Sequence, residues 1–338
     1  MDASFIDSAV AQVMASHKIP GITVSLVAPG KVFLRSYGDA DTTSKRKLAP
    51  SDHIRIGDIS TTFVSTLAIR LMEQGTLAFD ATLEQYVPGI PNGSSITVKQ
   101  LLGMQSGVFN FLDDQEFAKA FNENPLLPDW KPENIVPILQ RNPARFAPGQ
   151  KTEYSQSNPI LLGLVIQKVT QQPIENLLEE YIVKPLGIGS STIFPITSII
   201  ADPYSKGYNQ DKDVTASNPK VLWTSGGMIS TVPELTKYSK LLATGNLLSR
   251  ELLAERLKLN NMENPGGPPI RYGLGIMTVG HWIGHNGSAP GYGAVMLYLP
   301  QSDATLVVMT NQGTPTSENA TSLFLALAQQ LYPDSLQL

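Results

Sequence analysis

The decapeptide Ile54-Arg55-Ile56-Gly57-Asp58-Ile59-Ser60-Thr61-Thr62-Phe63 decides how the rest of the chain is organised. It marks the start of a helix, because Asp is among the residues preferred at a helix N-terminus. An apolar stripe at helical spacing follows and is closed by Gly75: Val64, Leu67, Ala68, Leu71 and Met72. We expect this helix to lie in the core.

The segment before the decapeptide predicts a helix followed by a hairpin. Apolar residues recur at helical spacing between Phe5 and Met14, and the pattern ends near Ile19-Pro20-Gly21. Two strand-like runs, 22–27 and 32–37, then flank the turn at 28–31. A turn this short favours a hairpin over a crossover connection.

The segment after the core helix is mostly helical, and strand character returns late. Helical patterns between about Leu77 and Asp202 cover 98–104, 116–122, 132–140, 159–170 and 174–182. Strand-like runs cover 226–230, 274–279, 293–299 and 305–310, and a final helix covers 322–331. The order predicts a helical lobe inserted into an α/β frame, with a late antiparallel meander.

Composition excludes several function classes. The chain has 338 residues, 42% hydrophobic and 16% charged, with a net charge of -4, which gives no electrostatic footprint for nucleic acid or an anionic membrane. It has no cysteine and only four histidines, so we expect neither a metal nor a cofactor. No signal peptide or apolar span of about 20 residues is recognisable. We therefore expect a cytoplasmic monomer or homodimer whose partner is a small molecule.

Ordered sequence blocks resemble the serine β-lactamase and DD-peptidase superfamily, in particular class C β-lactamases, D-stereospecific peptidases and family VIII esterases. The resemblance covers nearly the whole chain. The blocks are 54–57, 101–107, 146–149, 154–155, 161–163, 184–187, 226–228, 230–231, 272–275, 285–287 and 290–292.

The resemblance implies an α/β fold of the α+β type, with an antiparallel sheet flanked by the terminal helices and an inserted helical lobe. It places the α/β lobe at 1–62 and 206–338, the helical lobe at 63–205, and an active-site cleft between them. It also implies a hydrolase, although members of this superfamily are often exported.

Three family motifs can be carried over residue by residue. Ser-x-x-Lys falls on Asp58-Ile59-Ser60-Thr61, so both of its catalytic side chains have changed. Tyr-x-Asn falls on Tyr154-Ser155-Gln156, which keeps the Tyr and lengthens the amide. His-x-Gly falls on His285-Asn286-Gly287 and is intact.

The altered motif disfavours acyl-enzyme chemistry. Thr61 has no titratable group to activate a nucleophile, and attack by Asp58 on an amide would put two negative charges side by side. Asp58, Tyr154 and His285 instead form a workable acid/base set, in which Asp58 acts as base or charge stabiliser and Tyr154 and His285 donate or relay protons. If Asp58 lies close to His285, we expect it to raise the pKa of His285.

Simpler interpretations of the same residues stay open. Asp58 can cap its own helix, and Tyr154 and His285 can be ordinary buried hydrogen-bonding groups. Ser60 should point away from the nucleophile position, which argues against a substitute serine nucleophile. Attack by Asp58 on a saturated carbon, such as an epoxide, is a minor branch.

A second set of residues is expected to line the cleft and contact substrate: Thr61, Gln156, Trp223, Phe109, Asn286, Gly287, Ser288 and Tyr292. Ordinary packing is at least as good an explanation for Trp223.

Three functions follow from these residues. The first is a repurposed acid/base enzyme that acts on a neutral or cationic small molecule, for example in specialised metabolism, by water-mediated hydrolysis, isomerisation, cyclisation or elimination. The second is a non-catalytic ligand-binding homologue, and the third is a conventional ester or amide hydrolase.

Overall fold

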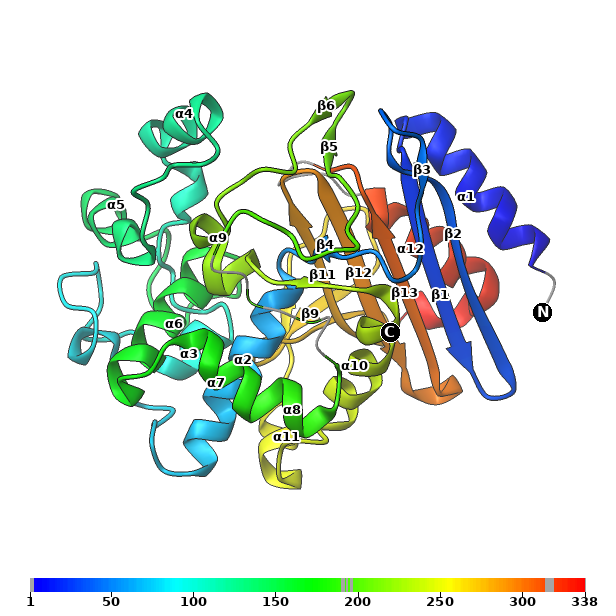
Figure 1. Cartoon of the computed structure of the whole chain (residues 1–338). Helices are drawn as coiled ribbons and strands as arrows, with labels where there is room; N and C mark the ends of the chain where they lie inside the picture. Colours follow the sequence, from blue (N-terminus) through cyan, green and yellow to red (C-terminus); the bar gives the residue numbers. More distant parts are fainter. Residues whose placement is uncertain (1–2, 190–191, 193, 195–196, 314–318, 338) are drawn as a thin grey trace.

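The computed structural model describes residues 3–189, 192, 194, 197–313 and 319–337, and it is built around one nine-stranded antiparallel sheet (Figure 1). From one edge to the other, the strands are β3 (Arg46–Lys47), β2 (Lys31–Asp41), β1 (Gly21–Ala28), β13 (Ala304–Thr310), β12 (Tyr292–Leu299), β11 (Trp282–Ala289), β10 (Met277–Val279), β9 (Ile270–Tyr272) and β8 (Asn260–Met262). Strands β12 and β13, at the centre of the sheet, are buried along their whole length, because each face is covered.

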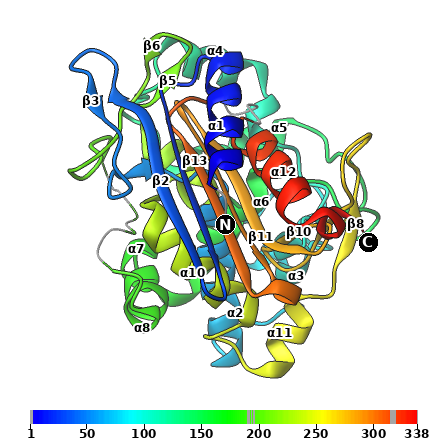
Figure 2. The same cartoon turned by 90° about the vertical axis from the view of Figure 1, so that its right-hand side faces the viewer.

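The two terminal helices cover one face of the sheet. Figure 2 shows α1 (Ser4–His17) and α12 (Asn319–Leu331) in front of the strands. Their buried side chains pack on Val24, Val308 and neighbouring strand residues. The buried helix residues are Ile6, Val10, Leu323, Phe324 and Leu327. Helical spacing therefore turns one stripe of each helix toward the sheet.

The opposite face is covered by α2 (Ile59–Glu73) and α10 (Val232–Thr244), which join it to the helical part of the chain. The other helices are α3 (Val98–Leu102), α4 (Gln115–Glu123), α5 (Ile135–Arg141), α6 (Ser157–Thr170), α7 (Ile174–Leu178), α8 (Lys184–Leu186), α9 (Pro219–Gly226) and α11 (Arg250–Arg256). Short 3-10 turns cover 83–85, 111–113, 132–134, 300–302 and 333–336, and one π-helical turn covers 179–183. Two small ladders pair β4 (Ile54–Arg55) with β7 (Ile229–Ser230) and β5 (Tyr208–Asn209) with β6 (Lys212–Asp213).

The structure confirms the predicted fold class, with its antiparallel sheet, terminal helices and helical region. Helix α2 is buried along most of its length, as expected for a core helix, and this burial includes the polar Ser60, Thr62 and Ser65. One apolar core runs from α2 and α6 to the sheet. The division into lobes at 62/63 and 205/206 stays a prediction.

Several local predictions were wrong. Most of 226–230 is not a strand: Gly226 ends α9, and only Ile229 and Ser230 pair, with β4. The strand predicted at 274–279 is confined to 277–279. Several further elements were missed: strands β8, β9 and β11 and helices α9, α10 and α11.

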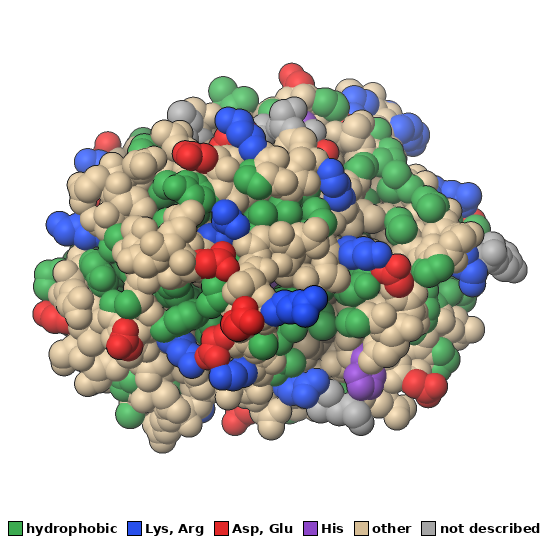
Figure 3. Space-filling view, turned by 90° about the horizontal axis from the view of Figure 1, so that it is seen from below, with side chains coloured by type: hydrophobic (Ala, Val, Ile, Leu, Met, Phe, Trp, Pro, Cys, Tyr) green, Lys and Arg blue, Asp and Glu red, His purple; other side chains and the backbone are tan. Residues whose placement is uncertain are grey.

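Charged side chains of both signs are mixed on the face seen from below in Figure 3, without one dominant basic or acidic area. Within the described ranges, no helix is both long and apolar enough to cross a bilayer.

Candidate active site

Asp58 sits where the chain turns from β4 into α2, and a close contact with β11 fixes its position. Gly57 has φ +54°, and a Cβ there would lie 2.4 Å from the Ser288 backbone nitrogen. On the other side of the contact, a Cβ on Gly287 would lie 2.2 Å from the Ile56 carbonyl oxygen. Only glycine allows two backbones to approach this closely, so the pair brings the Ser288 N–H to the start of α2.

The Asp58 carboxylate faces this contact and does not cap its helix. No capping hydrogen bond from its side chain is present at the start of α2. Instead, Asp58 Oδ2 accepts a hydrogen bond from the Ser288 N–H at 3.0 Å. Asp58 Oδ1 accepts from the Tyr154 hydroxyl at 3.3 Å and from Gln156 Nε2. The carboxylate therefore links the three family motifs, and the capping interpretation of Asp58 is wrong.

Burial sets the protonation preference of this carboxylate. Burial raises the pKa of Asp58 above its ordinary value, while the hydrogen bonds from Ser288 and Gln156 and the nearby His285 oppose the rise. Within the described part of the chain, no Lys or Arg forms an ion pair with Asp58. Thr61, at the family's lysine position, is 2% exposed, and its hydroxyl lies 3.4 Å from the Tyr154 hydroxyl.

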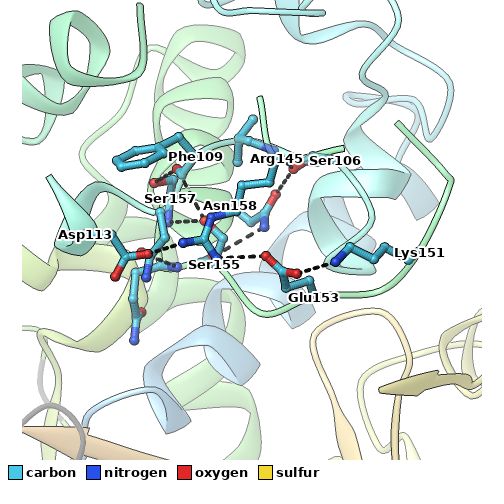
Figure 4. A network of polar contacts seen from close by, with 12 residues as sticks. Ser106, Phe109, Asp113, Arg145, Lys151, Glu153, Ser155, Ser157 and Asn158 are labelled. Atoms are coloured by element: carbon cyan, nitrogen blue, oxygen red, sulfur yellow. Dashed lines mark hydrogen bonds and ion pairs between the residues drawn. The ribbon is translucent and has the colours of Figure 1, made fainter. Parts of the chain in front are cut away.

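Tyr154 is held by the loop that precedes α6. Figure 4 shows the ion pairs of this loop, in which Arg145 bridges Asp113 and Glu153 and Lys151 also binds Glu153. In the same view, the Ser157 hydroxyl donates to the Phe109 carbonyl at 2.7 Å. Burial and the Asp58 charge raise the pKa of Tyr154 well above its ordinary value, so the phenol stays protonated at neutral pH and can donate.

His285 lies behind Tyr154 and does not bond to Asp58. Its Nδ1 is 2.5 Å from the carbonyl oxygen of Asn286, which requires a proton on Nδ1. Its Nε2, 3.0 Å from the Tyr272 hydroxyl, is then the acceptor. The imidazole ring meets the edge of Tyr154 at a centroid distance of 5.8 Å.

Asp58 acts on the pKa of His285 in the expected direction, but the net shift of that pKa is downward. Burial lowers the pKa of this 1% exposed side chain, and this effect outweighs the attraction of the Asp58 charge. Tyr272 was not among the predicted site residues. It lies in one of the sequence blocks, but nothing in the sequence indicates that its hydroxyl reaches the histidine from β9.

The structure brings some predicted cleft residues to Asp58 and places others in the core. Gln156 and Ser288 contact Asp58 directly, and Gly287 shapes the contact. Trp223, 5% exposed, packs on Gly163, whereas Tyr292, 0% exposed, donates to the Ser205 carbonyl. Because the side chains of Trp223 and Tyr292 are buried, we assign both a packing role.

Phe109, Asn286 and Ser60 each contact a residue other than Asp58. The Phe109 ring faces the Arg145 guanidinium, and the Asn286 amide donates to the Thr321 hydroxyl at 3.4 Å. Ser60 points away from Asp58, as expected, and its hydroxyl accepts from the Met228 N–H at 3.1 Å. No group of three or more acidic or histidine side chains with metal-site geometry occurs in the described ranges.

The Asp58 carboxylate contacts both a backbone N–H and a protonated phenol. A backbone N–H such as that of Ser288 is the kind of donor that holds a carbonyl oxygen during acyl transfer. Here the Asp58 carboxylate already occupies it. The same carboxylate and the protonated Tyr154 form an adjacent acceptor and donor.

Comparisons with known proteins agree with this fold. Protein flp of Staphylococcus aureus (strain MW2) is 26% identical over 318 residues, which cover 90% of this chain and 62% of that protein. The chain thus spans less than two thirds of that relative's length. Penicillin-binding protein 4* of Bacillus subtilis is 22% identical over 89% of this chain and 70% of that protein.

Solved structures superpose closely. A D-stereospecific amidohydrolase from Streptomyces sp. has a TM-score of 0.85 at 26% identity, covering 98% of this chain and 99% of the other. A D-amino acid amidase from Ochrobactrum anthropi has a TM-score of 0.82 at 23% identity and covers 97% and 99%, a likeness of fold. The beta-lactamase family matches residues 6–330, which is nearly the whole chain, and the chain therefore belongs to the beta-lactamase family.

Proposed function

We propose that this member of a hydrolase superfamily carries out non-covalent acid/base chemistry on a small neutral or cationic molecule. Asp58 is the proton acceptor and Tyr154 is the proton donor. One observation carries the proposal: the Asp58 carboxylate lies between the Ser288 N–H and the Tyr154 hydroxyl, with no lysine beside it within the described residues.

An acyl-enzyme is disfavoured by charge. A carbonyl oxygen that becomes negative near Ser288 would lie beside the Asp58 carboxylate. Two like charges about 4 Å apart cost on the order of 4 kcal/mol at an effective dielectric constant of about 20. The same repulsion disfavours ligands that place a carboxylate there, so neutral or cationic ligands are favoured.

The proton steps balance without a cofactor. Asp58 takes a proton from a C–H, N–H or O–H bond of the substrate, or from a water that attacks it. Tyr154 gives its proton to the atom on which negative charge develops, and Asp58 then returns a proton to Tyr154 across their 3.3 Å contact. Isomerisation, cyclisation, elimination and water-mediated hydrolysis all fit this cycle.

His285 acts in this scheme as a positioning residue. Its ring packs against Tyr154, and its Nε2 is occupied by Tyr272. It therefore orients the phenol, in place of the proton-relay role expected from the sequence.

A ligand-binding role is the second candidate, and a specific observation favours it. Three donors already satisfy the Asp58 carboxylate: Ser288 N–H, the Tyr154 hydroxyl and Gln156 Nε2. A carboxylate held in this way can serve as a fixed recognition group and never exchange a proton with the ligand.

A third candidate, amide hydrolysis, comes from the similar structures, which are those of an amidohydrolase and an amidase. In this chain that activity would have to proceed by direct attack of water, because the Ser and Lys of the family motif are replaced by Asp58 and Thr61.

The test is conversion of small molecules from an extract of the source organism, followed by mass spectrometry. We expect at least one compound to be converted by the wild type, and to be converted at least about 100-fold more slowly by Asp58→Asn and by Tyr154→Phe. Tyr298→Phe, which removes a part-buried hydroxyl bonded to Asp303, is the matched control and should convert normally.

Two results would count against the proposal. Wild-type rates in both Asp58→Asn and Tyr154→Phe would exclude the acid/base pair. A compound that the wild type retains and releases unchanged would favour the ligand-binding role.

A further inference from the structure

A cavity of about 640 Å³ adjoins the Asp58 site and has no role in the chemistry described so far. One wall is the segment 149–154, which ends at Tyr154, and the other is the edge strand β8 with Glu263. Its volume lies in the usual range for ligand sites, roughly 300–1,000 Å³. Because Tyr154 lines the cavity and bonds to Asp58, a ligand in the cavity would contact one member of the proposed acid/base pair.

The cavity is bordered by β8, the last strand of the nine-stranded sheet, whose outer edge pairs with no other described strand. The backbone groups of Pro269 and Gly273, which flank β9, point toward β10. The Gly280 N–H donates to the Pro269 carbonyl, and the Gly273 N–H donates to the Ile276 carbonyl. Hydrogen-bonding direction alternates along a strand, so Ile270 and Tyr272 bond toward β8.

The partners of Ile270 and Tyr272 on β8 are Met262 and Asn260. Asn261, between them, therefore turns its N–H and C=O away from β9. Asn261 makes no other backbone hydrogen bond within the described part of the chain. The outward N–H and C=O of such an edge residue can pair with one residue of an extended chain that adds to the sheet.

The charges of the cavity wall favour a positive ligand. Glu153 is neutralised, since Lys151 lies 2.6 Å and Arg145 2.8 Å from its two carboxylate oxygens. Glu263 has no ion pair within the described residues. The remaining polar wall is formed by carboxamides, which suit amide groups of a ligand: Gln105, Gln150, Asn260 and Asn261.

We infer that this cavity binds an extended, amide-containing chain that carries an ammonium group and no carboxylate. Its backbone pairs with Asn261, its positive charge lies near Glu263, and its far end reaches Tyr154. The inference deepens the proposed function and rests on it for what happens to the ligand, but the binding itself can be measured separately.

The experiment titrates the protein with triglycinamide, N-acetyltriglycinamide and N-acetyltriglycine, which are cationic, neutral and anionic versions of one backbone. Binding is followed by isotope-edited NMR of the backbone amides. We expect triglycinamide to bind most tightly and to shift residues 150–154 and 260–263, and N-acetyltriglycine not to bind. If no probe binds, or if the anionic probe binds best, the inference is wrong.

Two variants of Asn261 isolate the backbone contact. Asn261→Pro removes the outward N–H and should weaken triglycinamide binding about tenfold, whereas Asn261→Ala keeps the N–H and should bind as the wild type does. Equal losses in both variants would show that the side chain, and not strand pairing, makes the contact. The unchanged melting temperature of both variants is the folding control.

Two further variants separate charge from chemistry. Glu263→Gln should weaken triglycinamide binding and leave N-acetyltriglycinamide unaffected, and an equal effect on both probes would contradict the proposed charge contact. Asp58→Asn should keep triglycinamide binding while it abolishes turnover. If Asp58→Asn turns over normally but the peptide still binds, the proposed function fails and the cavity assignment stands.

Discussion

Asp58 combines a buried position with a full set of hydrogen-bond donors. The amide of Gln156 directs its N–H to the carboxylate, and this leaves Gln156 Oε1 buried without a partner among the described residues. That atom can only be satisfied by a donor, which a protonated Asp58 supplies after the amide rotates. The pair Asp58 and Gln156 is thus arranged to accommodate both protonation states.

Replacing Asp58 by Asn should stabilise the protein at neutral pH. Burial raises the pKa of Asp58 in the folded state above its unfolded value of 3.8, so the folded state holds the proton more tightly. The free energy of unfolding of the wild type therefore falls as pH rises from 3.8 through the folded pKa, and Asp58→Asn escapes this loss. We expect Asp58→Asn to be more stable by about 0.5–2 kcal/mol at pH 7.5, as is common for functional residues.

Urea unfolding at pH 7.5 and at pH values near and below 3.8 measures this difference. The advantage of Asp58→Asn should shrink as the pH falls. A wild type that is the more stable protein at pH 7.5 would contradict the expectation and show that the three donors outweigh burial.

At the level of elements, the site depends on the contact between the start of α2 and β11. We expect Gly57→Ala to cost several kcal/mol of unfolding free energy, because its Cβ would lie 2.4 Å from the Ser288 nitrogen and because φ is +54°. Gly75→Ala is the matched control, with φ +72° and no atom within 4 Å of its Cβ. It should cost only the conformational penalty of about 1–2 kcal/mol. Urea denaturation compares the two, and equal costs would mean that the contact is not tight.

Sequence patterns predicted the elements that are apolar on one stripe or throughout. The hairpin β1–β2, strands β12 and β13 and helices α1, α2, α6 and α12 follow such patterns, and the structure contains all of them. They were predictable because burial alone determines which residue types occur there.

The elements nearest the site did not follow these patterns. Strand β11, Trp282-Ile283-Gly284-His285-Asn286-Gly287-Ser288-Ala289, carries glycines and polar residues because it contacts α2 and Asp58. Helix α9 was hidden because Trp223 interrupts it with φ 37° and because its end coincides with Gly226-Gly227. The motifs predicted that Tyr154 and Gln156 would lie near Asp58. They could not predict how deeply His285 is buried, and burial is what lowers its pKa.

At the scale of the whole molecule, the fold and the chemistry are separable. The sheet is that of the family, whereas residues 58, 61 and 156 depart from the family motifs. Cytoplasmic location and a monomeric or dimeric state stay predictions from the sequence.

Restoring the side chains at positions 58 and 61 should therefore restore acyl chemistry. We expect Asp58→Ser/Thr61→Lys to be labelled covalently by a fluorophosphonate or a β-lactam, because the freed Ser288 N–H can bind the substrate oxygen and Tyr154 remains beside residue 61. Asp58→Ser alone is the control and should label at least about 100-fold more slowly. Intact-protein mass spectrometry measures the adduct. No labelling of the double variant would show that the cleft has changed beyond these two residues.

The contact between Asp58 and the Ser288 N–H also determines how the protein should respond to inhibitors. The Asp58 carboxylate belongs to the same chain as the Ser288 N–H, so a dissolved anion must compete with it at a much lower effective concentration. Boronates and other mimics of an acyl-transfer intermediate must displace it before they can bind. We therefore expect this chain to bind boronates weakly, and to favour amines, for which the Asp58 carboxylate is an acceptor already in place.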